Sequence, residues 1–196
     1  MTFCKVMQNN QPIRRIVMTN FNFNLETSQT VPGKHLLATR AFKSGELIYR
    51  IENFKRSADA NYQTIQVGPN EHIEELGALA YLNHSCNPGV IVNTSELTVR
   101  ACRAIAAGEE LNFFYPSTEW KMDRPFICLC GAPQCIRLVA GAFYVSLDVL
   151  GRYFINAHIR EMAAGWLEAS TNALWKVLPH ETGNVARDLL EACEVR

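Results

Sequence analysis

Three cysteines stand within eight residues of one another, and this cluster limits the possible folds more than any other feature. The segment runs Cys128-x-Cys130-x4-Cys135, with Gly131 and Pro133 between the last two cysteines. Closely spaced cysteines on a tight turn present thiolates to a tetrahedral ion such as zinc. A set of buried free thiols is the alternative, but it explains the adjoining glycine and proline less well. The cluster therefore predicts a loop closed by a metal ion.

Three thiolates do not complete a structural zinc site, which takes four ligands. The residues alone leave the fourth open among Cys86, Cys102, Cys4, Cys193 and a histidine. The chain has seven cysteines, an odd number that a disulfide framework does not explain well. An intracellular, reducing location in the cytoplasm or nucleus fits this cysteine usage better.

The size and charge of the chain exclude several classes of protein. Its 196 residues are enough for one domain, and 48% hydrophobic with 19% charged residues is typical of a globular chain. The formal net charge is zero, which argues against a protein that grips nucleic-acid phosphates directly. The longest apolar run, 138–147, is too short to span a bilayer, and the N-terminus shows no secretory signal. We therefore expect neither membrane association nor direct nucleic-acid binding.

Short strands separated by turn signals dominate the first two thirds of the chain. Residues 20–33 indicate a loop, and 74–82 a mixed segment with a helical turn before Asn83. Runs of β-branched and alternating apolar residues predict strands at 13–18, 36–38, 47–51, 62–67, 90–92, 97–101 and 110–115.

The last third has a different pattern. Apolar residues at helical spacing predict a helix over 145–164, whose face of Leu150, Tyr153, Phe154 and Ala157 should cover the sheet. Two shorter helices, split by Pro179 and Gly183, should follow over 167–195. The fold class expected is mainly β (α+β), with a β-rich core and C-terminal helices.

A second polar constellation, Asn83-His84-Ser85-Cys86-Asn87-Pro88, precedes the cysteine cluster by some forty residues. Taken alone it fits either a Cys/His nucleophile pair or a polar turn with a buried thiol. Neighbouring residues of a strand point to opposite faces, which disfavours a Cys–His pair so close in sequence.

Four motifs together resemble the SET-domain family of protein-lysine methyltransferases, over about 33–138. The N-terminal glycine motif is matched by 33–40 and the strand segment 43–48, and the central motif by 83–88. Gly108-Glu109-Glu110-Leu111, ending in Tyr115, is similar to the catalytic-tyrosine motif, and the cysteine cluster to the post-SET zinc segment. All four stand in the family's order.

The resemblance implies a SET-type β-clip core in which the central motif and the tyrosine segment thread into a pseudoknot. It also implies a structural zinc held by Cys86, Cys128, Cys130 and Cys135. The corresponding division is an N-terminal strand and loop at 1–32, a SET domain at 33–120, a post-SET segment at 121–140 and a helical appendage at 141–196.

The resemblance also implies an S-adenosylmethionine cofactor and a catalytic residue. The cofactor should contact Gly33, Lys34, His35, Leu36, Asn83 and His84. A target lysine should enter from the opposite side through a narrow channel, where Tyr115 orients its amine. Channel walls could include Tyr62 and Tyr81, and the substrate groove Trp120 and Phe126, although packing in the core is the alternative for all four.

Four positions depart from the family pattern near the expected pocket. His35 stands in place of a second glycine, Gly89 in place of an asparagine, Phe114 in place of an acidic or amide residue, and Arg137 in place of a glycine. Three hypotheses follow: a methyltransferase acting on a protein lysine, a repurposed SET-fold enzyme acting on a small molecule, and a non-catalytic binding module.

Overall fold

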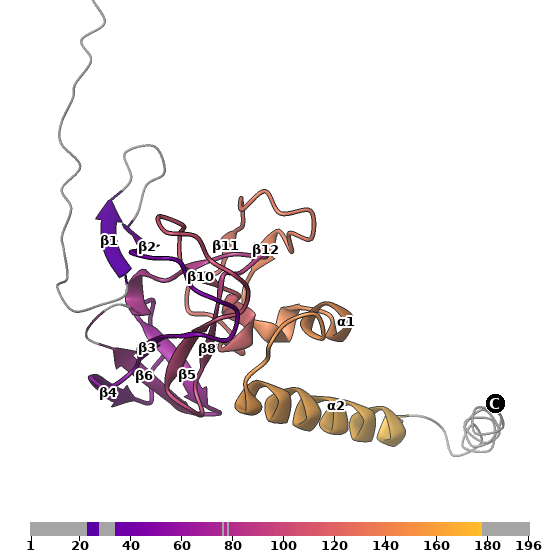
Figure 1. Cartoon of the computed structure of the whole chain (residues 1–196). Helices are drawn as coiled ribbons and strands as arrows, with labels where there is room; N and C mark the ends of the chain where they lie inside the picture. The colour runs from indigo at the N-terminus through magenta and orange to yellow at the C-terminus, as the bar shows by residue number, and fades with distance from the viewer. Residues whose placement is uncertain (1–22, 28–33, 76, 78, 178–196) are drawn as a thin grey trace, which may run out of the picture. The chain divides into compact units, whose positions relative to one another are not determined.

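The computed structural model describes residues 23–27, 34–75, 77 and 79–177, and most of its regular structure is β (Figure 1). The chain divides into two compact units, and the boundary in the sequence lies between Ile159 and Arg160. Several sequence predictions lie outside the described residues, namely the strand at 13–18, Cys4, Gly33, the helix break at 179–183 and Cys193.

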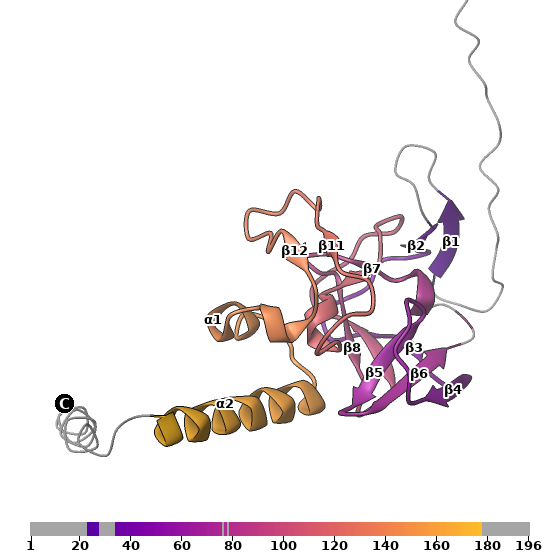
Figure 2. The ribbon, with the colours of Figure 1, turned by 180° about the vertical axis from the view of Figure 1, so that it is seen from behind.

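Short strands in five small sheets make up the first unit. One three-stranded antiparallel sheet has the order β3 (Leu47–Arg50), β9 (Thr98–Ala101), β8 (Val90–Asn93). The other has the order β4 (Phe54–Ser57), β6 (Glu71–Glu75), β5 (Thr64–Gly68), seen in both views (Figures 1 and 2). The two-stranded sheets pair β1 (Phe23–Thr27) with β2 (Lys34–Ala38), β7 (Asn83–His84) with β10 (Asn112–Phe113), and β11 (Phe126–Ile127) with β12 (Leu138–Val139). The mainly β fold with few helices is therefore confirmed.

The parallel pairing of β7 with β10 brings the central motif against the tyrosine segment. The Ser85 N–H extends this ladder by donating to the Phe113 carbonyl at 3.0 Å. The Leu111 N–H donates to the Leu36 carbonyl at 2.7 Å, which ties the same segment to β2. Three stretches far apart in sequence are thus joined at one place, as the expected pseudoknot requires.

A single large apolar cluster lies beneath these sheets. The side chains of β8 and β9 alternate into it, and each large one that leaves water contributes about 1.5–3 kcal/mol to folding. The fully enclosed members of the cluster, each at most 4% exposed, include Leu36, Phe42, Ile48, Ile73, Val90, Val92, Val99, Leu111 and Phe113.

The helix predicted over 145–164 is wrong in its middle. The chain forms the short α1 (Leu147–Leu150), an irregular stretch, and then α2 (Ala157–Val177). Asn156 fixes the irregular stretch because its amide donates to the Val92 and Ser117 carbonyls and its Oδ1 accepts from Thr94. These partners lie at least 39 residues away, so periodicity does not reveal them.

Other expectations need correction as well. The loop expected at 20–33 contains β1, and the strand expected at 110–115 is confined to Asn112–Phe113 before the 3₁₀ turn η2 (Tyr115–Ser117). Strands β4 and β6 were not predicted, although the helical turn before Asn83 is present as η1 (Leu79–Tyr81). The structure also contains the 3₁₀ turn η3 (Ala142–Tyr144), which precedes the short helix α1. Within the described residues, the helices are too short or too polar to cross a membrane.

Gly141 provides a test of the packing between the tyrosine segment and the C-terminal part of the first unit. Its φ is +107°, and a Cβ there would lie 2.5 Å from the Trp120 carbonyl oxygen. We expect Gly141→Ala to lower the free energy of unfolding by about 3 kcal/mol, from backbone strain and steric overlap together. Gly45→Ala is the matched control, because Gly45 has φ +81° but nothing within 4 Å of its Cβ position. Equal losses in urea unfolding would contradict this account.

Candidate functional site

Four cysteines converge on one point of the first unit. The sulfurs of Cys86, Cys128, Cys130 and Cys135 all lie within 4.8 Å of one another. Cys86 comes from the turn after β7, and the other three from the loop between β11 and β12. Cys102, another candidate for the fourth ligand, does not join this cluster. Its thiol donates a hydrogen bond to the Pro88 carbonyl at 3.1 Å.

The donor set fits a tetrahedral metal ion. Thiolates about 2.3 Å from a common centre stand roughly 3.8 Å apart, and the sulfurs of Cys86 and Cys128 are 4.0 Å apart. Burial raises the pKa of Cys86 and raises that of Cys128 to about 11. For Cys130 burial acts in the same direction, but the Ala132 N–H and the neighbouring thiols outweigh it and the pKa falls to about 7. All four thiols could ionise together only with a cation among them to offset their repulsion, which a bound metal ion would supply.

Arg137 explains one departure from the family pattern. Its φ is +64°, in the left-handed region where glycine is favoured, and its carbonyl accepts the Cys128 N–H. The left-handed backbone conformation that suits a glycine is therefore present at Arg137, where a side chain makes it less favourable. We expect Arg137→Gly to raise the free energy of unfolding by about 1 kcal/mol, measured by urea unfolding. A lower free energy of unfolding in Arg137→Gly would show that the arginine side chain stabilises the loop by more than its backbone conformation costs.

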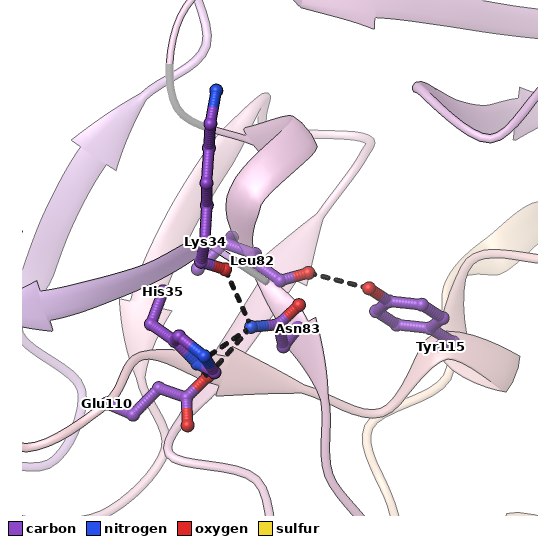
Figure 3. A network of polar contacts seen from close by, with 6 residues as sticks. All are labelled: Lys34, His35, Leu82, Asn83, Glu110 and Tyr115. Carbon is purple, nitrogen blue, oxygen red and sulfur yellow. Dashed lines mark hydrogen bonds and ion pairs between the residues drawn. The ribbon is translucent and has the colours of Figure 1, made fainter. Parts of the chain in front are cut away.

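Of the residues predicted to hold the cofactor, Lys34 and His35 on β2 lie beside Asn83 on β7 (Figure 3). The Asn83 amide donates to the Lys34 carbonyl at 3.0 Å and to Glu110 Oε1 at 2.9 Å. His35 Nδ1 lies 2.8 Å from the same oxygen, which also accepts from Asn83, so the histidine nitrogen donates. Leu36 points into the core. His35 thus takes part in a hydrogen-bond network with Asn83 and Glu110. Glu110 belongs to the motif before Tyr115, but the sequence analysis gave it no role.

His84 connects the four-cysteine cluster to the tyrosine segment. Its Nδ1 accepts the Tyr115 N–H at 3.2 Å, so its Nε2 carries the hydrogen and donates to the Cys86 sulfur at 3.2 Å. Burial lowers the pKa of His84 to about 4, which keeps the ring neutral at physiological pH. His84 and Cys86 thus form a contact that the sequence argument disfavours, because residues two apart on an extended chain share a face. Since His84 Nε2 donates in this contact, it provides no base for a nucleophilic thiol.

Tyr115 is held in place on both sides of its ring. Its hydroxyl donates to the Leu82 carbonyl at 2.9 Å (Figure 3), which leaves the oxygen lone pairs free to accept. Its ring centroid lies 5.3 Å from that of His84 and 4.8 Å from that of Phe113. Burial raises the pKa of Tyr115, so the phenol is neutral.

A pocket of about 210 Å³ opens beside Tyr115. Tyr62, Phe113 and Phe126 contribute rings to its lining, and Glu119 contributes a carboxylate. Tyr62 and Phe126 therefore occupy the place expected of channel or groove walls. Tyr81 and Trp120 do not line this pocket. Glu119 has no motif around it and was not predicted.

Phe114 and Gly89 lie away from this pocket. The Phe114 ring stacks on Tyr153, with centroids 3.8 Å apart and an interplanar angle of 7°. Tyr153 also donates from its hydroxyl to the Cys86 carbonyl at 2.8 Å. The Gly89 N–H donates to Asn112. The departure at Phe114 therefore serves the packing of the segment after α1.

Comparison with known proteins shows which family the chain belongs to. A family model described as the SET domain matches residues 33–116. The methyltransferase flvH of Aspergillus flavus is 38% identical over 141 residues, which cover 71% of this chain and 78% of that protein. The chain belongs to the SET-domain methyltransferase family.

Other SET-domain proteins are similar over shorter parts of their length. The H3 lysine-36 specific histone-lysine N-methyltransferase of Mycosarcoma maydis is 24% identical over 69% of this chain but only 15% of its own. Among solved structures, KRYPTONITE in complex with mCHG DNA and SAH has a TM-score of 0.48 and 18% identity, over 61% of this chain and 29% of that one. The methyltransferase domain of human SETMAR has a TM-score of 0.45 and 17% identity, over 62% and 58%.

Proposed function

We propose that this SET-domain protein transfers a methyl group from S-adenosylmethionine to the side-chain amine of a protein lysine. The observation that carries the proposal is the aromatic pocket beside Tyr115, next to the network of His35, Asn83 and Glu110. A volume of about 210 Å³ is below the roughly 300–1,000 Å³ of sites for larger ligands. It suits one extended side chain.

A separate observation supports binding of S-adenosylmethionine by the segment around His35. His35 Nε2 is buried and has no hydrogen-bond partner among the described residues. Because Nδ1 donates to Glu110, Nε2 is an acceptor, and the amino acid end of S-adenosylmethionine carries an ammonium donor. We propose that Lys34, His35 and Leu36 with Asn83 and His84 hold this cofactor, together with Gly33, which lies outside the described residues. When bound, it supplies an activated methyl group.

The residues of the pocket would prepare the amine for attack. A free lysine has a pKa near ~10.4, so its nitrogen must first lose a proton. A pocket walled by rings and close to a sulfonium lowers that pKa. Tyr115, neutral and fixed by Leu82, offers its oxygen to the amine and aligns the nitrogen with the methyl group.

We propose zinc as the ion at the four cysteines, in a structural role. A closed set of four thiolates leaves no open position for substrate, which is typical of structural rather than catalytic zinc. A thiolate site also suits the intracellular location, cytoplasm or nucleus, expected from the cysteine usage. The division of the chain into an N-terminal strand and loop (1–32), a SET domain (33–120), a post-SET segment (121–140) and a helical appendage (141–196) stays a prediction.

A second candidate is methyl transfer to the amine of a small molecule. The name of flvH, which shares 38% identity over most of this chain, gives a methyltransferase without a substrate and so is compatible with both candidates. A non-catalytic binding module is the third hypothesis, and the free lone pairs of Tyr115 inside a pocket weigh against it.

Label transfer separates these hypotheses. The purified chain would be incubated with methyl-labelled S-adenosylmethionine and, in parallel, with a lysine-containing peptide library and a pool of small primary amines. We expect label on peptide lysines. Label on the small amines alone would favour the second candidate, and label in neither pool would favour the third.

A further inference from the structure

Glu119 differs from the other acidic groups of the Tyr115 pocket in having no ionic partner. Asp123, which also lines the pocket, pairs with Arg124 at 3.6 Å. The Arg124 guanidinium lies over the Tyr62 ring, 4.8 Å from its centroid. Glu119 forms no salt bridge within the described residues, so it is the charge in the pocket that lacks a counter-ion.

The two oxygens of Glu119 have different surroundings. Oε1 accepts the Gln66 N–H at 2.9 Å and the Thr118 hydroxyl at 3.2 Å. No hydrogen bond from a described residue reaches Oε2. Oε1 therefore holds the carboxylate to β5 and to Thr118, whereas Oε2 keeps its lone pairs for another donor at this pocket-lining residue.

The pocket as a whole suits a cationic amine. Its lining includes the rings of Tyr62, Phe113, Tyr115 and Phe126. Ammonium groups are attracted to aromatic faces at up to about 6 Å. Tyr115 and Glu119 add two oxygens that accept hydrogen bonds from a nitrogen.

We propose that Glu119 is the base that removes the proton from the substrate ammonium in this pocket. The inference rests on the proposed function. One N–H bond of the ammonium breaks and the proton binds Glu119 Oε2. The nitrogen lone pair then attacks the methyl carbon, whose bond to sulfur breaks, so that the products are a methylated ammonium and a neutral thioether. The proton on Glu119 leaves to water at the pocket mouth.

The environment of Glu119 suits this task. Burial raises its pKa to about 7, against the opposing hydrogen bonds from Gln66 and Thr118. A carboxylate with an ordinary pKa near ~4.3 is a weak base for an ammonium, and the raised value narrows the gap. The titratable and charged groups around it are Tyr115, Asp123 and Arg124, together with His158, which donates to the Thr118 carbonyl.

The decisive variant is Glu119→Gln, because its amide oxygen still accepts from Gln66 but cannot take a proton. The unchanged protein should show a kcat/KM that falls below about pH 7, as Glu119 becomes protonated, with a lysine peptide selected from the library. Glu119→Gln should lose about 100-fold at pH 8 and lack that acid limb. Near pH 10 it should regain most of the loss, since the amine then deprotonates by itself.

Four controls keep the test independent of folding and of the proposed function. Glu119→Asp should keep the acid limb at a reduced rate, and Glu96→Gln, in the β8–β9 turn, should match the unchanged protein. Calorimetric titration with n-butylammonium at pH 8 should give at least tenfold weaker binding to Glu119→Gln. The thermal midpoint of that variant at pH 8 should not fall, because a neutral amide replaces a buried carboxylate.

The outcomes are distinguishable. Failure of label transfer with any peptide would remove the proposed function, and the butylammonium titration would still test Glu119 as the cation acceptor. An active protein whose Glu119→Gln variant keeps the acid limb, or loses less than threefold at pH 8, would overturn the inference.

Discussion

Removal of metal from the four cysteines is expected to unfold the loop over 121–140 and to destabilise the whole first unit. Structural zinc in small domains contributes an apparent ~10–16 kcal/mol, as much as the entire stability of an ordinary domain. Here the ion would join the turn after β7 to the loop between β11 and β12. We expect one zinc per chain by elemental analysis and a thermal midpoint lowered by more than 10 °C with a chelator.

Cysteine variants supply the matched comparison. Cys130→Ser should reproduce the effect of the chelator, because a hydroxyl is a poor ligand for zinc. Cys102→Ser should not, since the Cys102 sulfur lies outside the cluster and serine retains a donor for the Pro88 carbonyl. Purified protein free of zinc with an unchanged thermal midpoint would contradict the assignment.

Loss of the Tyr115 hydroxyl is the second change with a large expected effect. In Tyr115→Phe the ring still packs against His84 and Phe113, but the amine loses its oxygen acceptor and the Leu82 carbonyl its donor. We expect kcat to fall about 100-fold, comparable to the loss of one well-placed hydrogen-bonding group in other enzymes. Stability should fall by only about 1 kcal/mol.

Separate kinetic constants test this explanation. KM for S-adenosylmethionine should stay within about twofold, because the hydroxyl faces the pocket rather than the network of Asn83 and Glu110. Tyr144→Phe is the control, as Tyr144 is 58% exposed and does not line the pocket. An unchanged kcat in Tyr115→Phe would remove Tyr115 from the chemistry.

Most of the four-cysteine cluster could be anticipated because three of its members lie close together in the sequence. Three of the four cysteines lie on one short loop whose turn residues are visible in the sequence. The fourth, Cys86, was left open by the residues and indicated by family resemblance alone. The structure brings its sulfur to the same point, through the pairing of β7 with β10.

What sequence reasoning missed depends on contacts between distant segments. Glu119 owes its raised pKa to burial against β5, whose Gln66 is 53 residues away. The break in the helix predicted at 145–164 is held by Asn156 and its partners on other elements. The role of His35 could not be read from the sequence, where it only stands in place of a glycine, because its bond to Glu110 spans 75 residues.

The most direct test of the account is calorimetric titration of the zinc-loaded chain with S-adenosylmethionine. A SET-domain methyltransferase whose cofactor segment is formed by His35 and Asn83 should bind it saturably, one molecule per chain. Binding should weaken in Asn83→Ala, which removes the amide that joins Lys34 and Glu110. A chain that holds its metal and its fold but gives no saturable binding would contradict the methyltransferase assignment of its pocket.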